Sequence, residues 1–441
     1  MEEDKPQAQA LEVANGFKMT ELGPLPEHWQ VVRLGEVGKF INGYPFKPSD
    51  WVNKGLPIIR IQNLNDPRKS FNYFDGNLDK RYLIKNGDLL ISWSASLGVF
   101  IWNGQDAWLN QHIFKAVLDE GISKEYIYFC LLNFFILEAS AHLHGSTMKH
   151  IVKEKFLTLS IPLPPLPEQR AIAQVLRTVQ RAKEATERVI QATRELKKSL
   201  MRHLFTYGPV PLAEADRVPL KETEIGPIPE HWQVVRLGGI LELMRNGLSK
   251  KQNAEGYRIP VTRIQTIADE RIDPTKLGYV APLSNEQVAR YALRAGDILF
   301  SHINSEPHLG KTAIYEGYPN LLLHGMNLLL LRPNRHLCEP YFLNYLFKMY
   351  RTRGVFVSLA ARAVGQASIN QGKLSVVPIP LPPLPEQREI ARILQAVDQK
   401  IQAEERRKQA LEELFKTLLS HLMTGKIRVN HLIQENEEEI S

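Results

Sequence analysis

One ten-residue phrase, IPLPPLPEQR, occurs twice in the chain without a single change, at Ile161–Arg170 and at Ile379–Arg388. A second phrase is also repeated: GPLPEHWQVVRLG at Gly23–Gly35 returns at Gly226–Gly238 with isoleucine in place of one leucine. We call the phrase at Gly23–Gly35 and Gly226–Gly238 the opening phrase, because each copy precedes a copy of the other phrase. We call IPLPPLPEQR the closing phrase. The 441-residue chain therefore contains one long module used twice. A module of this length is too long for a stacked-repeat fold, and it predicts two pseudo-symmetric domains.

The stretches between an opening and a closing phrase differ much more than the phrases themselves. Weak echoes remain, such as IIRIQNL at Ile58–Leu64 against VTRIQTI at Val261–Ile267, and NGDLLIS at Asn86–Ser92 against AGDILFS at Ala295–Ser301. The opening and closing phrases frame each module and are nearly identical in both, which indicates that they do the same job. The stretches between them, the interiors, diverge, which indicates that they contact different partners.

Inside each module the pattern is that of a mixed α/β (α+β) fold. Short apolar, β-branched runs bounded by Asn-Gly or Gly-Asp turns predict strands, as at Trp29–Leu34, Leu56–Gln62 and Asp88–Ser92. One helix per module is expected, at Lys124–Ala139 and at Pro340–Arg353.

A long stretch without glycine or further proline follows each closing phrase, from Pro167 to Leu204 and from Pro385 to Leu422. Both stretches are rich in strong helix formers and begin with proline, whose missing N–H costs nothing at a helix start. Each helix would span about 57 Å at ~1.5 Å per residue, too long to be buried in one small domain. Two equivalent amphipathic helices pack most economically against each other, and a two-fold relation between the modules makes them an antiparallel coiled coil. The apolar seam expected from a heptad pattern consists of Ile172, Val175, Val179, Ala182, Val189, Leu196 and Leu200, and of Ile390, Ile393, Val397, Leu411, Leu414 and Leu418.

The formal charge of +7 understates the basic character of the chain, because the tail QENEEEIS contributes four negative charges. Residues 1–430 carry +11, which is +7 with those four charges removed, and this favours a polyanionic partner such as nucleic acid. The longest apolar run, Phe129–Leu137, is far too short to span a bilayer. The polar start MEEDKPQAQA does not resemble a secretory signal, and the isolated Cys130 and Cys338 fit a reducing compartment. We therefore expect a cytoplasmic protein.

Motifs for catalysis are incomplete in this sequence. SEPHLGKT at Ser305–Thr312 ends like a phosphate-binding loop but has serine where the first glycine is required. NGYPF at Asn42–Phe46 lacks the adjacent prolines of an adenine-methyltransferase motif, and no glycine-rich dinucleotide fingerprint follows a strand. His142 and His144 have no acidic or cysteine ligand at metal spacing. The sequence predicts a protein that is not an enzyme, with no catalytic residues, metal or cofactor. A DNA-acting enzyme and a coiled-coil scaffold without DNA binding remain as alternatives to a DNA-binding subunit.

These phrases and their order resemble the specificity (S) subunits of Type I restriction–modification systems. The similarity covers nearly the whole chain and includes INGYPFKPSDWVNKGLPIIRIQNLN at Ile41–Asn65. It also includes the loop GSTMKHI at Gly145–Ile151 and its counterpart GQASIN at Gly365–Asn370. The tandem of closing phrases followed by long helices is specific to that family, whereas a single Gly-Asp pair is not.

The resemblance implies a protein that reads double-stranded DNA and performs no chemistry itself. In that family two target recognition domains each read one half of a split, asymmetric sequence, and two long helices hold the halves at a set separation. Two modification (adenine methyltransferase) subunits dock on the helices, and restriction/translocase subunits join them. The expected bounds are 20–160 and 222–378 for the first and second target recognition domains, 161–207 and 379–425 for the spacer helices, and 426–441 for an acidic tail.

Base readout requires forked donors and amides at base edges, while lysines and hydroxyls hold phosphates. Such side chains gather after a predicted strand in each module and in the loop before each closing phrase. Arg60 and Arg263 fall inside the repeated frames, so structural hydrogen bonds are an equally good explanation for these two. The candidate DNA-binding residues are Arg60, Gln62, Asn63, Asn65, Arg68, Lys69, Ser146, Thr147, Lys149, His150, Arg263, Gln265, Thr266, Gln366, Ser368 and Asn370.

Overall fold

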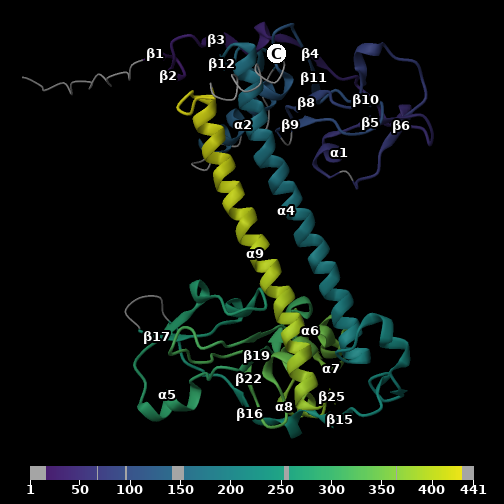
Figure 1. Ribbon diagram of the computed structural model, residues 1–441, viewed down its shortest axis with the longest axis vertical. Coiled ribbons are helices and arrows are strands. Elements are labelled where there is room, and N and C mark those ends of the chain that lie inside the picture. The colour runs from purple at the N-terminus through teal and green to yellow at the C-terminus, as the bar shows by residue number, and fades with distance from the viewer. Residues whose placement is uncertain are drawn as a thin grey trace, which may run out of the picture. The chain divides into compact units, whose positions relative to one another are not determined.

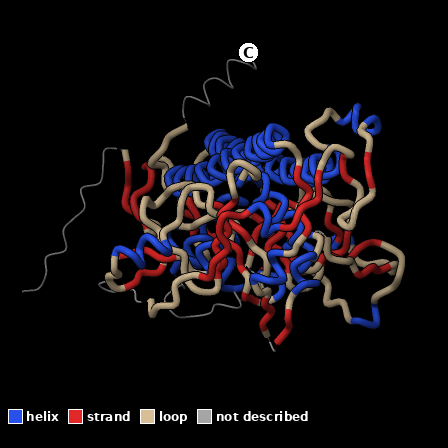
Figure 2. The backbone as a smooth tube through the Cα atoms, turned by 90° about the horizontal axis from the view of Figure 1, so that it is seen from below, coloured by secondary structure: helices blue, strands red, loops and turns tan. Residues whose placement is uncertain are grey.

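The chain forms two compact units, and each of them combines residues from both modules. Unit 1 consists of Met1–Glu187 with Arg406–Ser441, and unit 2 of Arg188–Glu405. Each unit holds one domain of short strands and loops, called domain 1 or domain 2, and a stretch of each of two long helices (Figure 1). Short strands, short helices and loops alternate within the domains (Figure 2). The computed structural model describes residues 16–66, 68–94, 97–141, 153–252, 258–363 and 365–429.

The two longest helices are α4 (Leu166–Tyr207) and α9 (Leu384–Met423), both continuous over their whole length (Figure 1). They confirm the two long helices expected after the closing phrases. Each begins one residue before the proline that was expected to start it. Pro167 and Pro385 still lie in the first turn, where a missing N–H costs no helical hydrogen bond. With 42 residues, α4 is ~63 Å long.

Within each unit the two helix stretches run antiparallel, as expected. In unit 1, Lys408 Nζ lies 2.6 Å from Glu187 Oε1, and Lys183 Nζ lies 6.0 Å from the ring centroid of Phe415. The lower number on α4 pairs with the higher number on α9, which defines the antiparallel order. The corresponding contacts in unit 2 are the ion pairs Arg194–Glu405 at 2.7 Å and Lys197–Asp398 at 2.6 Å.

The expected heptad seam is wrong at three positions. Val189 is 41% exposed, Leu196 52% and Leu414 45%, whereas Ile190 and Ile401, which the heptad pattern left out, are buried. A strict heptad assumes 3.5 residues per turn, but a straight α-helix has 3.6 and drifts by ~20° per heptad. Over helices of this length the drift moves the contact stripe by up to one position along the sequence.

The repeated phrases bind each other in both units. In unit 1, Glu168 of the closing phrase accepts a hydrogen bond from Trp29 Nε1 at 3.0 Å, and the same carboxylate oxygen lies 2.9 Å from His28 Nε2. A substitution in either phrase would remove a partner from the other, which accounts physically for why both phrases are kept together. The equivalent contacts in unit 2 join Glu386 to Trp232 Nε1 at 3.0 Å and to His231 Nε2 at 2.8 Å.

The glutamine that follows each of these glutamates ties the closing phrase to its domain. Gln169 Oε1 accepts from the Ser123 backbone N–H at 2.8 Å, and its Nε2 donates to the carbonyl of the proline five residues earlier. Gln387 makes the same two bonds, the first with the Glu339 backbone N–H at 2.8 Å. Ser123 and Glu339 each precede the main helix of their domain, so each closing phrase fixes the start of that helix.

Domain 1 is built on an antiparallel sheet with the strand order β4-β11-β8-β9. A second sheet has the order β6-β5-β10-β7, in which β5 and β10 run parallel. The ladder between β3 and β12 joins the opening phrase to the closing phrase, and β1 pairs with β2. The bounds are β1 (Phe17–Thr20), β2 (Gly23–Pro26), β3 (Gln30–Arg33), β4 (Gly38–Asn42), β5 (Leu56–Ile59), β6 (Asn72–Phe74), β7 (Leu83–Ile84), β8 (Leu89–Ser92), β9 (Gly98–Ile101), β10 (Ala107–Leu109), β11 (Ile113–Leu118) and β12 (Ser160–Leu163).

Domain 2 repeats the first of these sheets strand for strand, in the order β16-β22-β19-β21. It also contains the pair β17–β18, the three strands β20-β24-β23 and the phrase-joining ladder β15–β25. The bounds are β13 (Leu220–Lys221), β14 (Ile228–Pro229), β15 (Gln233–Arg236), β16 (Leu241–Asn246), β17 (Ile259–Val261), β18 (Gly278–Val280), β19 (Ile298–Ser301), β20 (Ile303–Asn304), β21 (Thr312–Ile314), β22 (Leu328–Pro333), β23 (Ala361–Ala363), β24 (Gln366–Ser368) and β25 (Pro378–Leu381).

The main domain helices, expected at Lys124–Ala139 and Pro340–Arg353, are confirmed to within two residues as α2 and α6. The core of unit 1 packs Phe129 of α2 with Leu419 and Leu422 of α9, which explains why the last turns of α9 belong to unit 1. None of the helices in the described part of the chain is both long and apolar enough to cross a membrane. The bounds of the domain helices are α1 (Ile61–Asn65), α2 (Lys124–Ala141), α3 (Lys153–Leu157), α5 (Asn285–Tyr291), α6 (Pro340–Thr352), α7 (Val355–Leu359) and α8 (Gln371–Ser375).

Candidate nucleic-acid interface

In domain 1, the C-terminal ends of β4, β5, β8 and β10 lie on the same side, which we call the edge of the domain. Strands β4 and β8 both run antiparallel to β11, so both end at the same edge of their sheet. The chain leaves β4 through Gly43, where a Cβ atom would collide with the Asn110 carbonyl. The next residue, Tyr44, donates its backbone N–H to the Leu109 carbonyl of β10 at 2.8 Å. Since β10 runs parallel to β5, the residues that follow β5 emerge at this edge as well.

The turn after β5 is shaped by Asn63, one of the candidate DNA-binding residues. Asn63 is 1% exposed. Its Oδ1 accepts from the Arg60 backbone N–H at 3.2 Å, and its Nδ2 donates to the carbonyls of Lys69 and Ser70, both at 3.2 Å. The amide therefore holds its own loop together. The expected strand Leu56–Gln62 ends early at Ile59, because this turn starts the short helix α1.

Arg60 is held from two sides inside domain 1. Its Nη1 donates to Asn72 Oδ1 at 3.1 Å, and its guanidinium carbon lies 5.4 Å from the ring centroid of Trp51. This geometry is that of a structural arginine, one of the two explanations open from the sequence. Arg60 also borders a hollow of about 230 Å³ whose other lining residues are Phe46, Trp51, Ile61, Gln62, Asn110, Gln111 and His112.

The remaining candidates of this loop lie at the surface. Gln62, Asn65, Arg68 and Lys69 are all exposed. Arg68 Nε lies 2.9 Å from Asp66 Oδ1, and this hydrogen bond lowers the pKa of the Asp66 carboxyl. An exposed ion pair of this kind contributes little to stability. The other candidates of domain 1, Ser146, Thr147, Lys149 and His150, lie outside the described residues.

Domain 2 builds the equivalent turn with threonine in place of asparagine. Thr266 is fully buried, accepts from the Arg263 backbone N–H at 2.8 Å and donates to the Lys276 carbonyl at 2.8 Å. Arg263 Nε donates to Gln252 Oε1 at 2.6 Å. Gln265 between them is exposed. The two repeated Arg-Ile-Gln turns thus have the same plan: the arginine and the fourth residue are engaged by protein, and the glutamine faces solvent.

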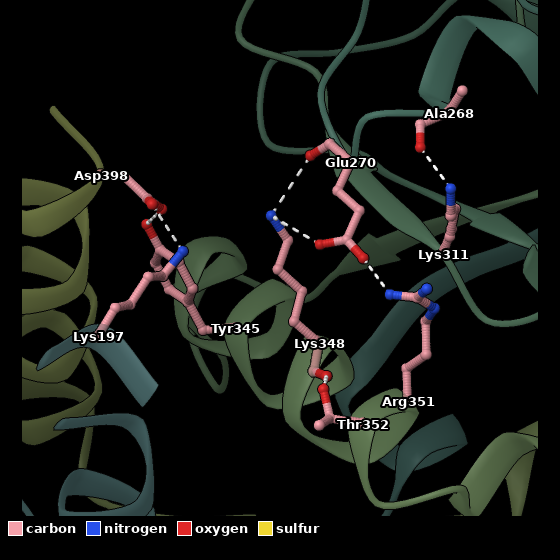
Figure 3. A network of polar contacts seen from close by, with 9 residues as sticks. All are labelled: Lys197, Ala268, Glu270, Lys311, Tyr345, Lys348, Arg351, Thr352 and Asp398. Atoms are coloured by element: carbon pink, nitrogen blue, oxygen red, sulfur yellow. Dashed lines mark hydrogen bonds and ion pairs between the residues drawn. The ribbon is translucent and has the colours of Figure 1, made fainter. Parts of the chain in front are cut away.

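A network of charged residues fixes the segment that follows this turn (Figure 3). Lys311 Nζ donates to the Ala268 carbonyl at 2.5 Å, and Lys348 Nζ of α6 donates to the Glu270 carbonyl at 3.3 Å. The Glu270 carboxylate pairs with Arg351 and lies 3.7 Å from Lys348. Glu270 has a φ of 57°, which costs a side-chain-bearing residue energy. The network offsets this cost and pins the turn to α6.

The second candidate cluster of domain 2 lies on β24 and just after it. Gln366 is exposed, Ser368 is half-buried, and Asn370 caps α8 by accepting from the Lys373 backbone N–H at 2.8 Å. The backbone N–H of Ile369 donates to the His302 carbonyl at 2.8 Å. The cluster is therefore tied to the end of β19.

The structure brings the two clusters of domain 2 to one edge. Gly325 donates its backbone N–H to Thr262 Oγ1 at 2.9 Å, directly before Arg263. The same turn leads into β22, where Leu328 pairs with Ser301 of β19. Ser301 directly precedes His302, whose carbonyl is joined to the segment after β24. The turn between Gly325 and Asn327 thus links the first cluster to the second.

Comparison with known proteins assigns the chain to a family. The model of the family described as the Type I restriction modification DNA specificity domain matches residues 26–194 and 229–413, which cover most of both modules. The chain belongs to this family.

Two curated relatives are also similar to the chain. A putative Type I restriction enzyme MjaX specificity subunit of Methanocaldococcus jannaschii is 53% identical over 204 residues, which are 46% of this chain and 48% of that relative. This alignment spans about half the length of the relative. The Type I restriction enzyme MjaVIII specificity subunit of the same organism is 26% identical over 417 residues, covering 92% of this chain and 95% of the relative.

The fold has a counterpart among solved structures. The S subunit of a Type I restriction–modification system from M. genitalium matches with a TM-score of 0.58, covering 93% of this chain and 98% of that chain. The sequence identity is 16%, so this likeness concerns the fold alone.

Two residues that sequence reasoning did not select, Trp93 of domain 1 and His302 of domain 2, lie at the same edges. In domain 1, Trp93 donates from Nε1 to Asn42 Oδ1 at 3.2 Å, and its ring centroid is 5.6 Å from that of His112. In domain 2, His302 occupies the position of Trp93, because each follows the serine that ends β8 or β19. The signal was present in the sequence, since the aligned frames GDLLIS and GDILFS place these residues directly after an echo of the repeat.

Burial distinguishes His302 and His324 of domain 2 from the exposed histidines. Burial lowers the pKa of His302 to about 4, while the hydrogen bond to the Asn327 backbone acts in the opposite direction. Burial also lowers the pKa of His324, which is fully buried. Both rings are therefore neutral at pH 7. Across the described residues, no three His, Cys, Asp or Glu side chains gather as metal ligands would.

Proposed function

We infer that this chain is the DNA sequence-recognition subunit of a Type I restriction–modification complex. The observation that carries the inference is the family match over both modules, each of which ends its strands in a polar, solvent-facing turn. Each domain reads one half of a bipartite, asymmetric DNA target. The chain performs no chemistry and directs the adenine methylation or restriction performed by its partners.

The partners follow from this role. Two modification (adenine methyltransferase) subunits bind along α4 and α9, restriction/translocase subunits join them, and the two helices act as the spacer between half-sites. The excess positive charge of residues 1–430 supports double-stranded DNA as the ligand, because phosphate neutralisation dominates such binding. The bipartite domain plan also argues against the two alternatives, a self-contained DNA enzyme and a scaffold without DNA.

Within the candidate set we propose a division of labour based on exposure and hydrogen bonding. Asn63 and Thr266 hold the turns, and Arg60 and Arg263 support them, since protein groups engage their side chains. Ser146, Thr147, Lys149 and His150 remain predictions from the sequence. The side chains that we propose to contact DNA are Gln62, Asn65, Arg68, Lys69, Gln265, Gln366, Ser368 and Asn370, the last through Nδ2 because its Oδ1 caps α8.

A methylation map tests this function. The chain is co-expressed with modification subunits of its system in a host without other adenine methylation, and all methylated adenines are located by sequencing. We expect one motif made of two specified parts separated by an unspecified gap. The matched variants Gln62→Ala and Gln265→Ala should each relax a different part. Methylation without any motif, or methyl transfer by the purified chain alone, would contradict the proposal.

A further inference from the structure

A hollow of about 470 Å³ lies beside the second candidate cluster of domain 2. One of its lining side chains, that of His302, has a buried nitrogen without a partner among the described residues. The lining of the hollow includes His302, Asn246, Ser368 and Asn370. His302 is 8% exposed, and its Nδ1 has no hydrogen-bond partner among the described residues. Burying an unpaired polar atom is unfavourable, so a site that retains one is expected to receive a partner from a ligand.

The chemistry of Nδ1 follows from the protonation of the ring. At pH 7 the imidazole is neutral, so one nitrogen carries a proton and the other is an acceptor. The unpaired Nδ1 is the acceptor when the proton is on Nε2. In that tautomer Nδ1 can accept a hydrogen bond from a donor of the ligand.

The position of the hollow beside a candidate DNA-binding loop favours a DNA base as the source of this donor. Two of its lining residues, Ser368 and Asn370, belong to the loop that corresponds to GSTMKHI of the first module. The His302 carbonyl is fixed by the Ile369 backbone N–H, so the ring is held beside that loop. In DNA, the donors that base edges present in the major groove are the exocyclic amino groups of adenine and cytosine.

We propose that His302 is a specificity-determining residue of domain 2, whose Nδ1 accepts a hydrogen bond from the amino group of an adenine or cytosine in the second half-site. This rests on the proposed function. The corresponding residue of domain 1 is Trp93, whose Nε1 is a donor engaged by Asn42. An acceptor in one domain and a donor in the other, at the same place of the same sheet, suits two domains that read different bases.

Base analogues test the proposal on the unchanged protein. Once the methylation map has given the motif, the full chain with its modification subunits is titrated with duplexes in which one base at a time lacks only its amino group. Purine replaces adenine, and 2-pyrimidinone replaces cytosine. We expect one position of the second half-site to lose about tenfold in affinity, as for one hydrogen bond that leaves a buried acceptor unpaired. If every position of that half-site tolerates the deletion, the proposal is overturned.

Variants then connect that position to the histidine. His302→Phe should bind the amino-containing and amino-lacking duplexes equally, whereas His302→Gln, which retains an acceptor, should keep a preference. His308→Phe, at an exposed histidine of the same domain, is the matched control and should behave as the unchanged protein. A uniform loss of affinity at all positions in His302→Phe, with no rescue by glutamine, would assign the ring a structural role. Failure of the proposed function would look different, since the unchanged protein would then show no sequence preference at all.

Discussion

Domain 1 and domain 2 use the same residues where each meets its closing phrase and different residues where its strands end. The Trp29–Glu168 and Trp232–Glu386 hydrogen bonds are both 3.0 Å long. At the strand ends, by contrast, domain 1 has Trp93, whose Nε1 donates to Asn42, and domain 2 has His302, whose Nδ1 has no partner among the described residues. Where the two domains have the same sequence, they make the same hydrogen bonds. Their sequences differ mainly where we propose that each domain contacts DNA.

We call the contact between an opening phrase and its closing phrase a junction. The two junctions differ in how exposed the central glutamate is. In unit 1, Arg428 Nε lies 3.4 Å from Glu168 Oε1, and the glutamate side chain is only 5% exposed. In unit 2 the Glu386 side chain is 27% exposed. The residue at the place of Arg428, counted from the glycine that ends each long helix, is Pro211, which carries no charge. The end of the chain therefore closes the first junction more tightly than the inter-domain segment closes the second.

Replacing the interior of one domain is the largest test of this comparison. Residues 36–160 are exchanged for the corresponding segment of a related chain, while both repeated phrases are kept. The related chain that supplies the segment must have apolar residues at the positions of Phe129 and Cys130, which pack against α9 in unit 1. We expect one half of the methylated motif to change completely and the other half to remain. A change in both halves would show that the two readers are coupled, contrary to the additivity expected of independent sites.

Removing the junction tryptophans should have the next largest effect, on stability. Trp29 and Trp232 are both fully buried. Truncating such a side chain costs about 3–5 kcal/mol through lost burial and the cavity left behind. Trp29→Ala and Trp232→Ala should therefore lower the free energy of unfolding by similar amounts in denaturant titrations. Trp51→Ala, at a 37% exposed tryptophan of domain 1, is the control and should change it far less. A large effect from only one of the junction variants would break the equivalence of the two junctions.

The repeat and the helix-forming stretches were sufficient to predict the two domains and the two long helices, because both depend on local sequence. The contact stripe was harder, since it depends on how a straight helix drifts against a heptad, as Val189 and Ile190 show. At the candidate site, residue type identified polar turns correctly. It did not reveal that Asn63 and Thr266 turn inward to their own loops, because an amide or hydroxyl suits a base edge and a backbone carbonyl equally well.

The network around Glu270 gives a smaller test, confined to domain 2. In Glu270→Gln, Arg351 loses its anionic partner and the largely buried Lys348 loses the charge beside it. Burial already lowers the pKa of Lys348, and Glu270 counteracts this. Its removal should therefore destabilise the turn by more than the loss of an exposed ion pair, about 1 kcal/mol, and by less than the loss of a fully buried one, about 3–5 kcal/mol. We expect weaker discrimination in the second half-site only, measured by binding titration. Asp269→Asn, at an exposed neighbour, should leave binding unchanged; equal effects of the two variants would mean that charge alone matters.

The smallest expected effects separate base contacts from phosphate contacts within one loop of domain 1. Gln62 and Lys69 are both exposed beside the turn that Asn63 holds. Gln62→Ala should reduce discrimination at one base by about 1 kcal/mol, as the loss of one base-edge contact does. Lys69→Ala should weaken binding to all sequences by less than that and lower the salt dependence of log K by about one unit, as the loss of one phosphate contact does. Titrations at several salt concentrations against single-base variants distinguish the two. A sequence-specific effect from Lys69→Ala, or a uniform one from Gln62→Ala, would reverse the roles assigned to these side chains.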